Sequence, residues 1–141
     1  MISATEHFWQ DCGATVTEAL LPIRKLVDAA VSGSPYLTRL ILRHCEFVIH
    51  LINADPNVVL ANLNIEVLTF EHSNSRDQIA SGLRIAKQKA ALLIGLADLG
   101  QVWSVMEVTN ALTIFADTCL NTSINFLLRE NENKQKLSAR D

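Results

Sequence analysis

Residues 83–128 decide the fold: LRIAKQKAALLIGLADLGQVWSVMEVTNALTIFADTCLNTSINFLL. Two long segments with helical apolar spacing lie on either side of a short break, Asp98 to Trp103. Helical periodicity on both sides of a short turn is typical of a helical hairpin. We predict a first helix from about Asp77 to about Ala97 and a second from about Val105 to about Arg129.

The two arms of this hairpin differ in pattern. The first ends in Ala90 to Ala97, which has no polar side chain, and a helix that is apolar all round must be covered all round. This half-helix should be the most buried segment, since it is too short to span a membrane. The second arm opens with a capping box, Ser104 to Glu107. Its predicted core face is formed by Val105, Val108, Leu112, Phe115, Cys119 and Phe126.

Helix signals continue upstream of the hairpin. Ser34-Pro35 and Asp55-Pro56 each place a capping residue before a proline at the first helical position. The first predicts a helix to about Asn53. Residues 58–68 are rich in β-branched side chains, which fit helix or strand; we choose helix because no second strand signal exists to pair with it. Pro22 should kink or start a helix, and Gly33 should end one.

The polar segment 71–75 should be a loop, with Ser75 or Asn74 capping the first arm. We therefore predict an all-α fold of about five helices. Residues 1–130 would form a single helical domain, and residues 131–141 a polar, disordered tail.

Composition narrows the class of protein. The chain has 141 residues, 49% of them hydrophobic, which suits one domain with a real core. A net charge of −3 gives no electrostatic case for nucleic acid or an anionic membrane as a partner. The start of the chain lacks the pattern of a secretory signal. Three scattered cysteines indicate reduced thiols and a cytoplasmic protein, with Cys119 packed as a small apolar residue.

Several short motifs in the hairpin resemble one known family. They are Leu83-Arg84-x-x-Lys87, Ala97-Asp98-Leu99-Gly100, Glu107-Val108-Thr109, Ala111-Leu112-Thr113 and Phe115-Ala116-Asp117, with Ser34-Pro35-Tyr36-Leu37-x-x-Leu40 upstream. In order and spacing they resemble glutamine synthetase adenylyltransferase of bacteria, over the N-terminal helical region that precedes its first nucleotidyltransferase domain. The resemblance covers most of the chain, from about Ser34 to Leu128.

The resemblance implies an enzyme of nitrogen regulation that transfers AMP from ATP, with Mg²⁺, to glutamine synthetase. It also implies control by a PII regulatory protein. The chain itself has no Gly-Ser turn followed by spaced aspartates, no P-loop and no GxGxxG motif. We therefore expect no catalytic, cofactor-binding or metal-binding residue in it, and no activity of this chain alone.

A few polar residues have two possible roles. Asp98 ends a helix, where a negative charge is disfavoured. It should either bond the amides of the Leu99-Gly100 turn or pair with a basic residue, or else contact a nucleotide or regulator in the intact enzyme. Arg84 and Lys87 form either a solvated face or a contact to a catalytic domain. Asp117 should be solvated or ion-paired, and Trp103 should pack over the hairpin turn.

One cluster has the side chains of a metal site, namely His44, Cys45, Glu46 and His50. Glu46 and His50 are four residues apart and share a helical face, but two ligands do not make a site. A surface pair is the better interpretation.

A second hypothesis is of another class. It makes the chain a free-standing helical adaptor whose apolar faces bind a partner protein. The high apolar content also predicts self-association, as a two-fold homodimer.

Overall fold

The computed structural model describes residues 2–140, and over that range it contains helices and no strand. Helix, with the 3₁₀ turns included, makes up 88% of the described residues, well above the roughly one third typical of globular proteins. The helices are α1 (Ala4–Ala19), α2 (Arg24–Gly33), α3 (Pro35–Arg43), α4 (Cys45–Leu51), α5 (Pro56–Thr69), α6 (Arg76–Leu99) and α7 (Val105–Arg140). Two 3₁₀ turns, η1 (Leu21–Ile23) and η2 (Phe70–His72), join α1 to α2 and α5 to α6. The all-α prediction is confirmed, with more helices than the five expected.

The extra helices come from breaks that the spacing of apolar residues did not show. The helix predicted from Ser34 to about Asn53 is divided at His44, whose backbone is non-helical at φ −119° and ψ 40°. The His44 ring nitrogen Nε2 lies 2.7 Å from Oε1 of Gln88 on α6, so a tertiary contact accompanies the break. Pro22 lies in η1, where it separates α1 from α2 as expected of a proline.

Predicted helix starts are confirmed by their capping bonds. The side chains of Ser34 and Ser75 accept hydrogen bonds from the amides of Leu37 and Gln78, each at 3.1 Å. At the start of α7 both bonds of the capping box are present: the Glu107 amide donates to Ser104 Oγ at 3.2 Å, and the Ser104 amide donates to Glu107 Oε1 at 3.3 Å. Each such cap satisfies an amide that the helix itself leaves free.

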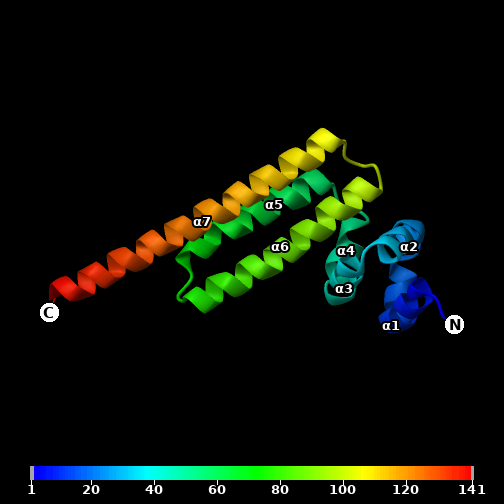
Figure 1. Cartoon of the computed structure of the whole chain (residues 1–141), viewed down its shortest axis with the longest axis horizontal. Coiled ribbons are helices and arrows are strands. Elements are labelled where there is room, and N and C mark those ends of the chain that lie inside the picture. The colour runs from blue at the N-terminus through cyan, green and yellow to red at the C-terminus, as the bar shows by residue number, and fades with distance from the viewer. Residues whose placement is uncertain (1, 141) are drawn as a thin grey trace.

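The helices form two groups that share α6. Helices α5, α6 and α7 run side by side as a bundle, and α1 to α4 gather against the C-terminal half of α6 (Figure 1). The half-helix Ala90–Ala97 lies between the groups: Leu93 and Ile94 belong to the core of the bundle, while Leu92 and Leu96 belong to the core under α1 to α4. The prediction that this segment is deeply buried is confirmed, and it is apolar all round because it meets a core on each side.

Helix α7 differs most from its prediction. Its core face carries Phe115, Cys119 and Phe126 as predicted, whereas Val105 is 78% exposed and Leu112 is 54% exposed, so those two assignments were wrong. Ala111 and Thr122 are buried in their place. The helix also continues to Arg140 and projects past the bundle, although residues 131–141 were expected to be disordered (Figure 1). Asp141 lies outside the described residues.

Helix α7 also has the length of a membrane span. Within the described chain it is the one helix, over Val105–Ala139, that is long and apolar enough to cross a bilayer, with a mean hydropathy of 1.2 over an 18-residue window. A helix that contributes to the core of a folded domain meets the same criterion, and the face with Phe115 and Phe126 does so here.

Candidate functional site

An open groove runs along the outer side of the bundle between α6 and α7. It encloses about 460 Å³. Its floor is made by three small side chains, Ala90, Ala91 and Ala116, and its α7 side by Leu112 and Leu120. Small residues on facing helices leave a trough because no side chain is large enough to fill it. The groove is apolar, lies on both arms of the hairpin and is our candidate for a contact surface.

One charged residue that the sequence singled out, Lys87, lines this groove. Arg84 and Asp98 share the α6 face of Lys87 and Ala91, since residues three, four or seven apart lie above one another on a helix. All three charged side chains are exposed, and among the described residues none of them forms an ion pair. Asp117 is exposed too. The groove is thus an apolar trough with the charged Lys87 among its lining residues.

The structural role predicted for Asp98 is wrong. The turn after α6 satisfies its own amides: Gln101 N–H donates to the Asp98 carbonyl at 3.0 Å, and Val102 N–H donates to the Ala97 carbonyl at 2.9 Å. These two bonds are the Schellman pattern that ends many helices. Gln101 takes the left-handed position, with φ 55°, that glycine usually fills. The Asp98 carboxylate is therefore left exposed, while Trp103 packs into the bundle core as predicted.

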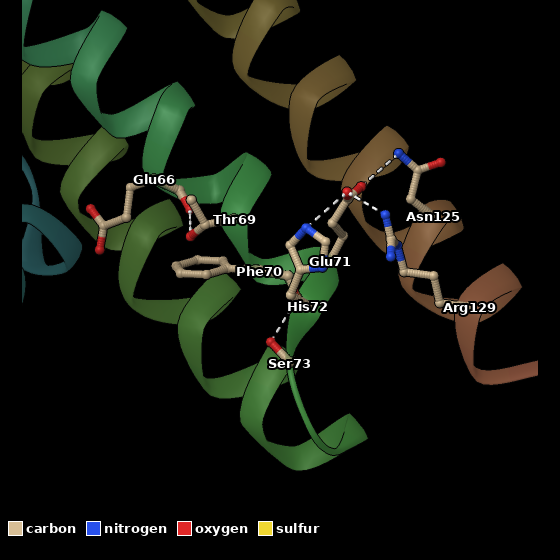
Figure 2. A network of polar contacts seen from close by, with 8 residues as sticks. All are labelled: Glu66, Thr69, Phe70, Glu71, His72, Ser73, Asn125 and Arg129. Atoms are coloured by element: carbon tan, nitrogen blue, oxygen red, sulfur yellow. Dashed lines mark hydrogen bonds and ion pairs between the residues drawn. The ribbon is translucent and has the colours of Figure 1, made fainter. Parts of the chain in front are cut away.

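The other end of the hairpin is held by a polar network that sequence reasoning missed. The Glu71 carboxylate accepts hydrogen bonds from Asn125 at 3.0 Å and Arg129 at 3.1 Å and lies 3.3 Å from His72 Nε2 (Figure 2). Arg76 donates to Glu130 at 2.7 Å, and this bond lowers the pKa of Glu130. The residues that α7 contributes are more than fifty positions away from their partners in sequence, so no local motif predicts these contacts. These contacts fix α7 against the connection between α5 and α6.

Thiols and potential metal ligands are the remaining candidates for chemistry in the residues that the structure describes. Burial raises the pKa of the Cys119 thiol, and burial together with the nearby Cys45 raises that of Cys12 to about 11. Such thiols are protonated at neutral pH and make poor nucleophiles. Between residues 2 and 140 no group of three His, Cys, Asp or Glu side chains is placed to hold a metal ion, which includes the cluster around His44 and His50.

The geometry therefore defines a class: a helical domain that offers an apolar groove for contact. Comparison with known proteins then gives the family. The model of the glutamate-ammonia ligase adenylyltransferase family matches residues 24–140 of this chain. The chain belongs to that family, as its hairpin motifs indicated.

Curated relatives support the same assignment, and all carry the name bifunctional glutamine synthetase adenylyltransferase/adenylyl-removing enzyme. The relative from Bradyrhizobium sp. (strain ORS 278) is 37% identical over 120 residues, which are 84% of this chain and 12% of the relative. The relative from Rhodopseudomonas palustris is 31% identical over 128 residues, which are 90% of this chain and 13% of the relative. The chain thus spans about one eighth of the length of these relatives. No solved structure matches it significantly.

Proposed function

We propose that this chain is the non-catalytic, N-terminal helical region of a glutamine synthetase adenylyltransferase. The observation that carries the proposal is the family match over residues 24–140, together with the small share, 12–13%, of each relative that it represents. Phosphoryl and nucleotidyl transfer need carboxylates that hold Mg²⁺ against the phosphates. Among the described residues no group of three His, Cys, Asp or Glu side chains is placed to hold a metal ion, which supports our proposal that the chemistry belongs to other parts of the intact enzyme.

The intact enzyme supplies the biological context of the proposal. It would transfer AMP from ATP to glutamine synthetase, remove it again as the relatives' name states, and respond to a PII protein in the cytoplasm. This chain would act within it as a rigid support. The exposed charges of Arg84, Lys87 and Asp98 on one face of α6 suit a contact with a neighbouring part of the enzyme.

Two assays test whether this chain alone has a catalytic centre. Calorimetric titration of the chain with ATP and Mg²⁺ should give no measurable heat of binding. Incubation with glutamine synthetase and labelled ATP should transfer no label. Tight binding of ATP with Mg²⁺, or transfer of label, would contradict the proposal.

A third assay distinguishes a support within the intact enzyme from a free-standing adaptor. The exposed apolar residues of α7 favour the adaptor. The matching segment is deleted from the Bradyrhizobium relative, and this chain is added in trans. A support restores adenylylation, whereas an adaptor for an unrelated protein leaves the deleted enzyme inactive. Leu93→Asp, which disrupts the shared core, serves as the unfolded control.

A further inference from the structure

The outer face of α7 carries a stripe that nothing in the described chain covers. We name it the outward stripe, and it consists of Val105, Thr109, Leu112, Ala116, Leu120, Ser123 and Leu127. Spacings of three and four residues place all seven on one side of the helix. Its large apolar members are about half or more exposed, and no charged side chain belongs to it. It follows the α7 wall of the groove that α6 completes.

The outward stripe has similar residue types at equal distances on either side of Ala116. Four residues away on either side lie Leu112 and Leu120. Seven residues away lie the hydroxyl residues Thr109 and Ser123, and eleven away lie Val105 and Leu127. A two-fold axis at Ala116 would place each residue against its counterpart on an antiparallel copy. Self-complementarity of this kind is what a two-fold interface requires, because the same patch serves on both subunits.

The hydroxyl groups of the stripe already have partners. Thr109 Oγ1 donates to the Val105 carbonyl at 2.9 Å, and Ser123 Oγ donates to the Cys119 carbonyl at 2.8 Å. Burial of these side chains would therefore leave no unpaired donor, which is the usual cost of a polar group in an interface. The small side chain of Ala116 at the centre allows the two helix backbones to approach closely.

We propose that the chain forms a two-fold dimer in which the α7 helices of two copies pack antiparallel along their outward stripes, with Ala116 at the axis. The stripe is roughly 33 Å long at 1.5 Å per residue. Because the groove beside the stripe receives the partner helix, α6 adds to the contact through Ala91. This dimer goes beyond the proposed function, since it requires no other part of the enzyme.

Sedimentation velocity over a range of concentrations tests the dimer. The unmodified chain should show a concentration-dependent dimer. Leu112→Glu should raise the dissociation constant at least about 100-fold, because each of two interface sites would bury an unpaired carboxylate. The matched control is Ile114→Glu on the same helix: Ile114 is 53% exposed, like Leu112, but points to another side. It should leave the dimer intact.

Mixing two variants tests the register. Leu112→Glu and Leu120→Lys should each be monomeric alone. Their mixture should form a heterodimer, because the new carboxylate at position 112 would face the new amine at position 120. This rescue also shows that the variants are folded. A chain that stays monomeric at all concentrations, a Leu112→Glu variant that still dimerises, or a mixture without heterodimer would each overturn the proposal.

A lipid surface is the competing occupant, since α7 has the length and composition of a membrane span. Co-sedimentation with phosphatidylcholine–phosphatidylglycerol vesicles distinguishes it. We expect the dimer to stay in the supernatant. Binding to vesicles that is abolished by Leu112→Glu but not by Ile114→Glu would assign the outward stripe to lipid and overturn the dimer.

Discussion

Two regions of the hairpin are rich in apolar residues, and they have different environments. Residues Ala90–Ala97 of α6 are enclosed, because the bundle covers one side and α1 to α4 cover the other. Residues 105–128 of α7 pack on α5 and α6 through one face only, and apolar side chains such as Leu112 and Leu120 remain exposed. The segment that is apolar all round is thus covered within the chain, whereas apolar residues of α7 outside its core face are left exposed.

The difference in burial between the two regions is tested by shortening a leucine side chain in each of them. Leu93 is 2% exposed and Leu112 is 54% exposed. Leu93→Ala should lower the free energy of unfolding by about 2–5 kcal/mol, the usual range for a buried leucine. Leu112→Ala should lower it by less than about 1 kcal/mol at concentrations where the chain is monomeric. Chemical denaturation of both variants measures the difference, and equal losses would mean that the two regions are equally buried.

A substitution on the core face of α7 tests how its buried hydroxyl differs from the hydroxyls of the outward stripe. Thr122 is fully buried, and its hydroxyl has no hydrogen-bond partner, unlike the hydroxyls of the outward stripe. Thr122→Val keeps the shape of the side chain and removes the unpaired group. It should raise the free energy of unfolding by about 1 kcal/mol. A loss of stability in the melting curve would mean that the hydroxyl has a partner after all.

The turn that joins the two regions should gain stability from a glycine. Gln101 has a left-handed backbone with φ 55°, which costs a residue with a Cβ about 1 kcal/mol. Gln101→Gly should therefore raise stability by roughly 0.5–1 kcal/mol, less the greater freedom of the unfolded glycine. Urea denaturation measures it. A clear loss would indicate that the Gln101 side chain contributes contacts of its own.

A smaller effect, with a pH dependence, is expected at the far end of α7. The bond from Arg76 lowers the pKa of Glu130 in the folded state. The stability that this bond gives the folded state is thus fully present above the pKa that the carboxyl has in the unfolded chain. It is lost as the pH falls through the lower pKa that the carboxyl has in the folded chain. Glu130→Gln should be less stable than the unmodified chain at pH 7, and the two should converge in acid. A difference that persists at pH 2 would exclude this ion pair as the cause.

The smallest effect should come from Asp98. Its carboxylate is exposed, and the backbone alone satisfies the turn. Asp98→Ala should change the free energy of unfolding by less than about 0.5 kcal/mol. Any loss of adenylylation when the same change is made in a full-length relative would then come from a role of Asp98 in function and not from a loss of stability. A thermal melt of the chain checks the first statement, and a large downward shift would restore the structural role of Asp98.

Local signals predicted much of this fold. Ser34-Pro35, Asp55-Pro56 and the capping box at Ser104 placed helix starts correctly because capping depends on neighbouring residues. The break at His44 and the network around Glu71 were missed, since both depend on contacts with residues far away in sequence. The core face of α7 was assigned partly wrongly because two apolar stripes lie side by side on that helix. The spacing of apolar residues reveals both stripes but does not show which of them faces the core. The groove follows from how α6 and α7 pack, which no single motif encodes.

The unequal coverage of the two regions can be measured directly by thiol labelling. Leu93→Cys and Leu112→Cys are made separately in a chain whose Cys12, Cys45 and Cys119 are replaced by alanine. Each is treated with a maleimide at concentrations low enough for a monomer. The thiol at position 112 should react almost as fast as in the unfolded chain, and the thiol at position 93 should react only when the domain opens, several orders of magnitude more slowly. Similar rates at the two positions would contradict the account.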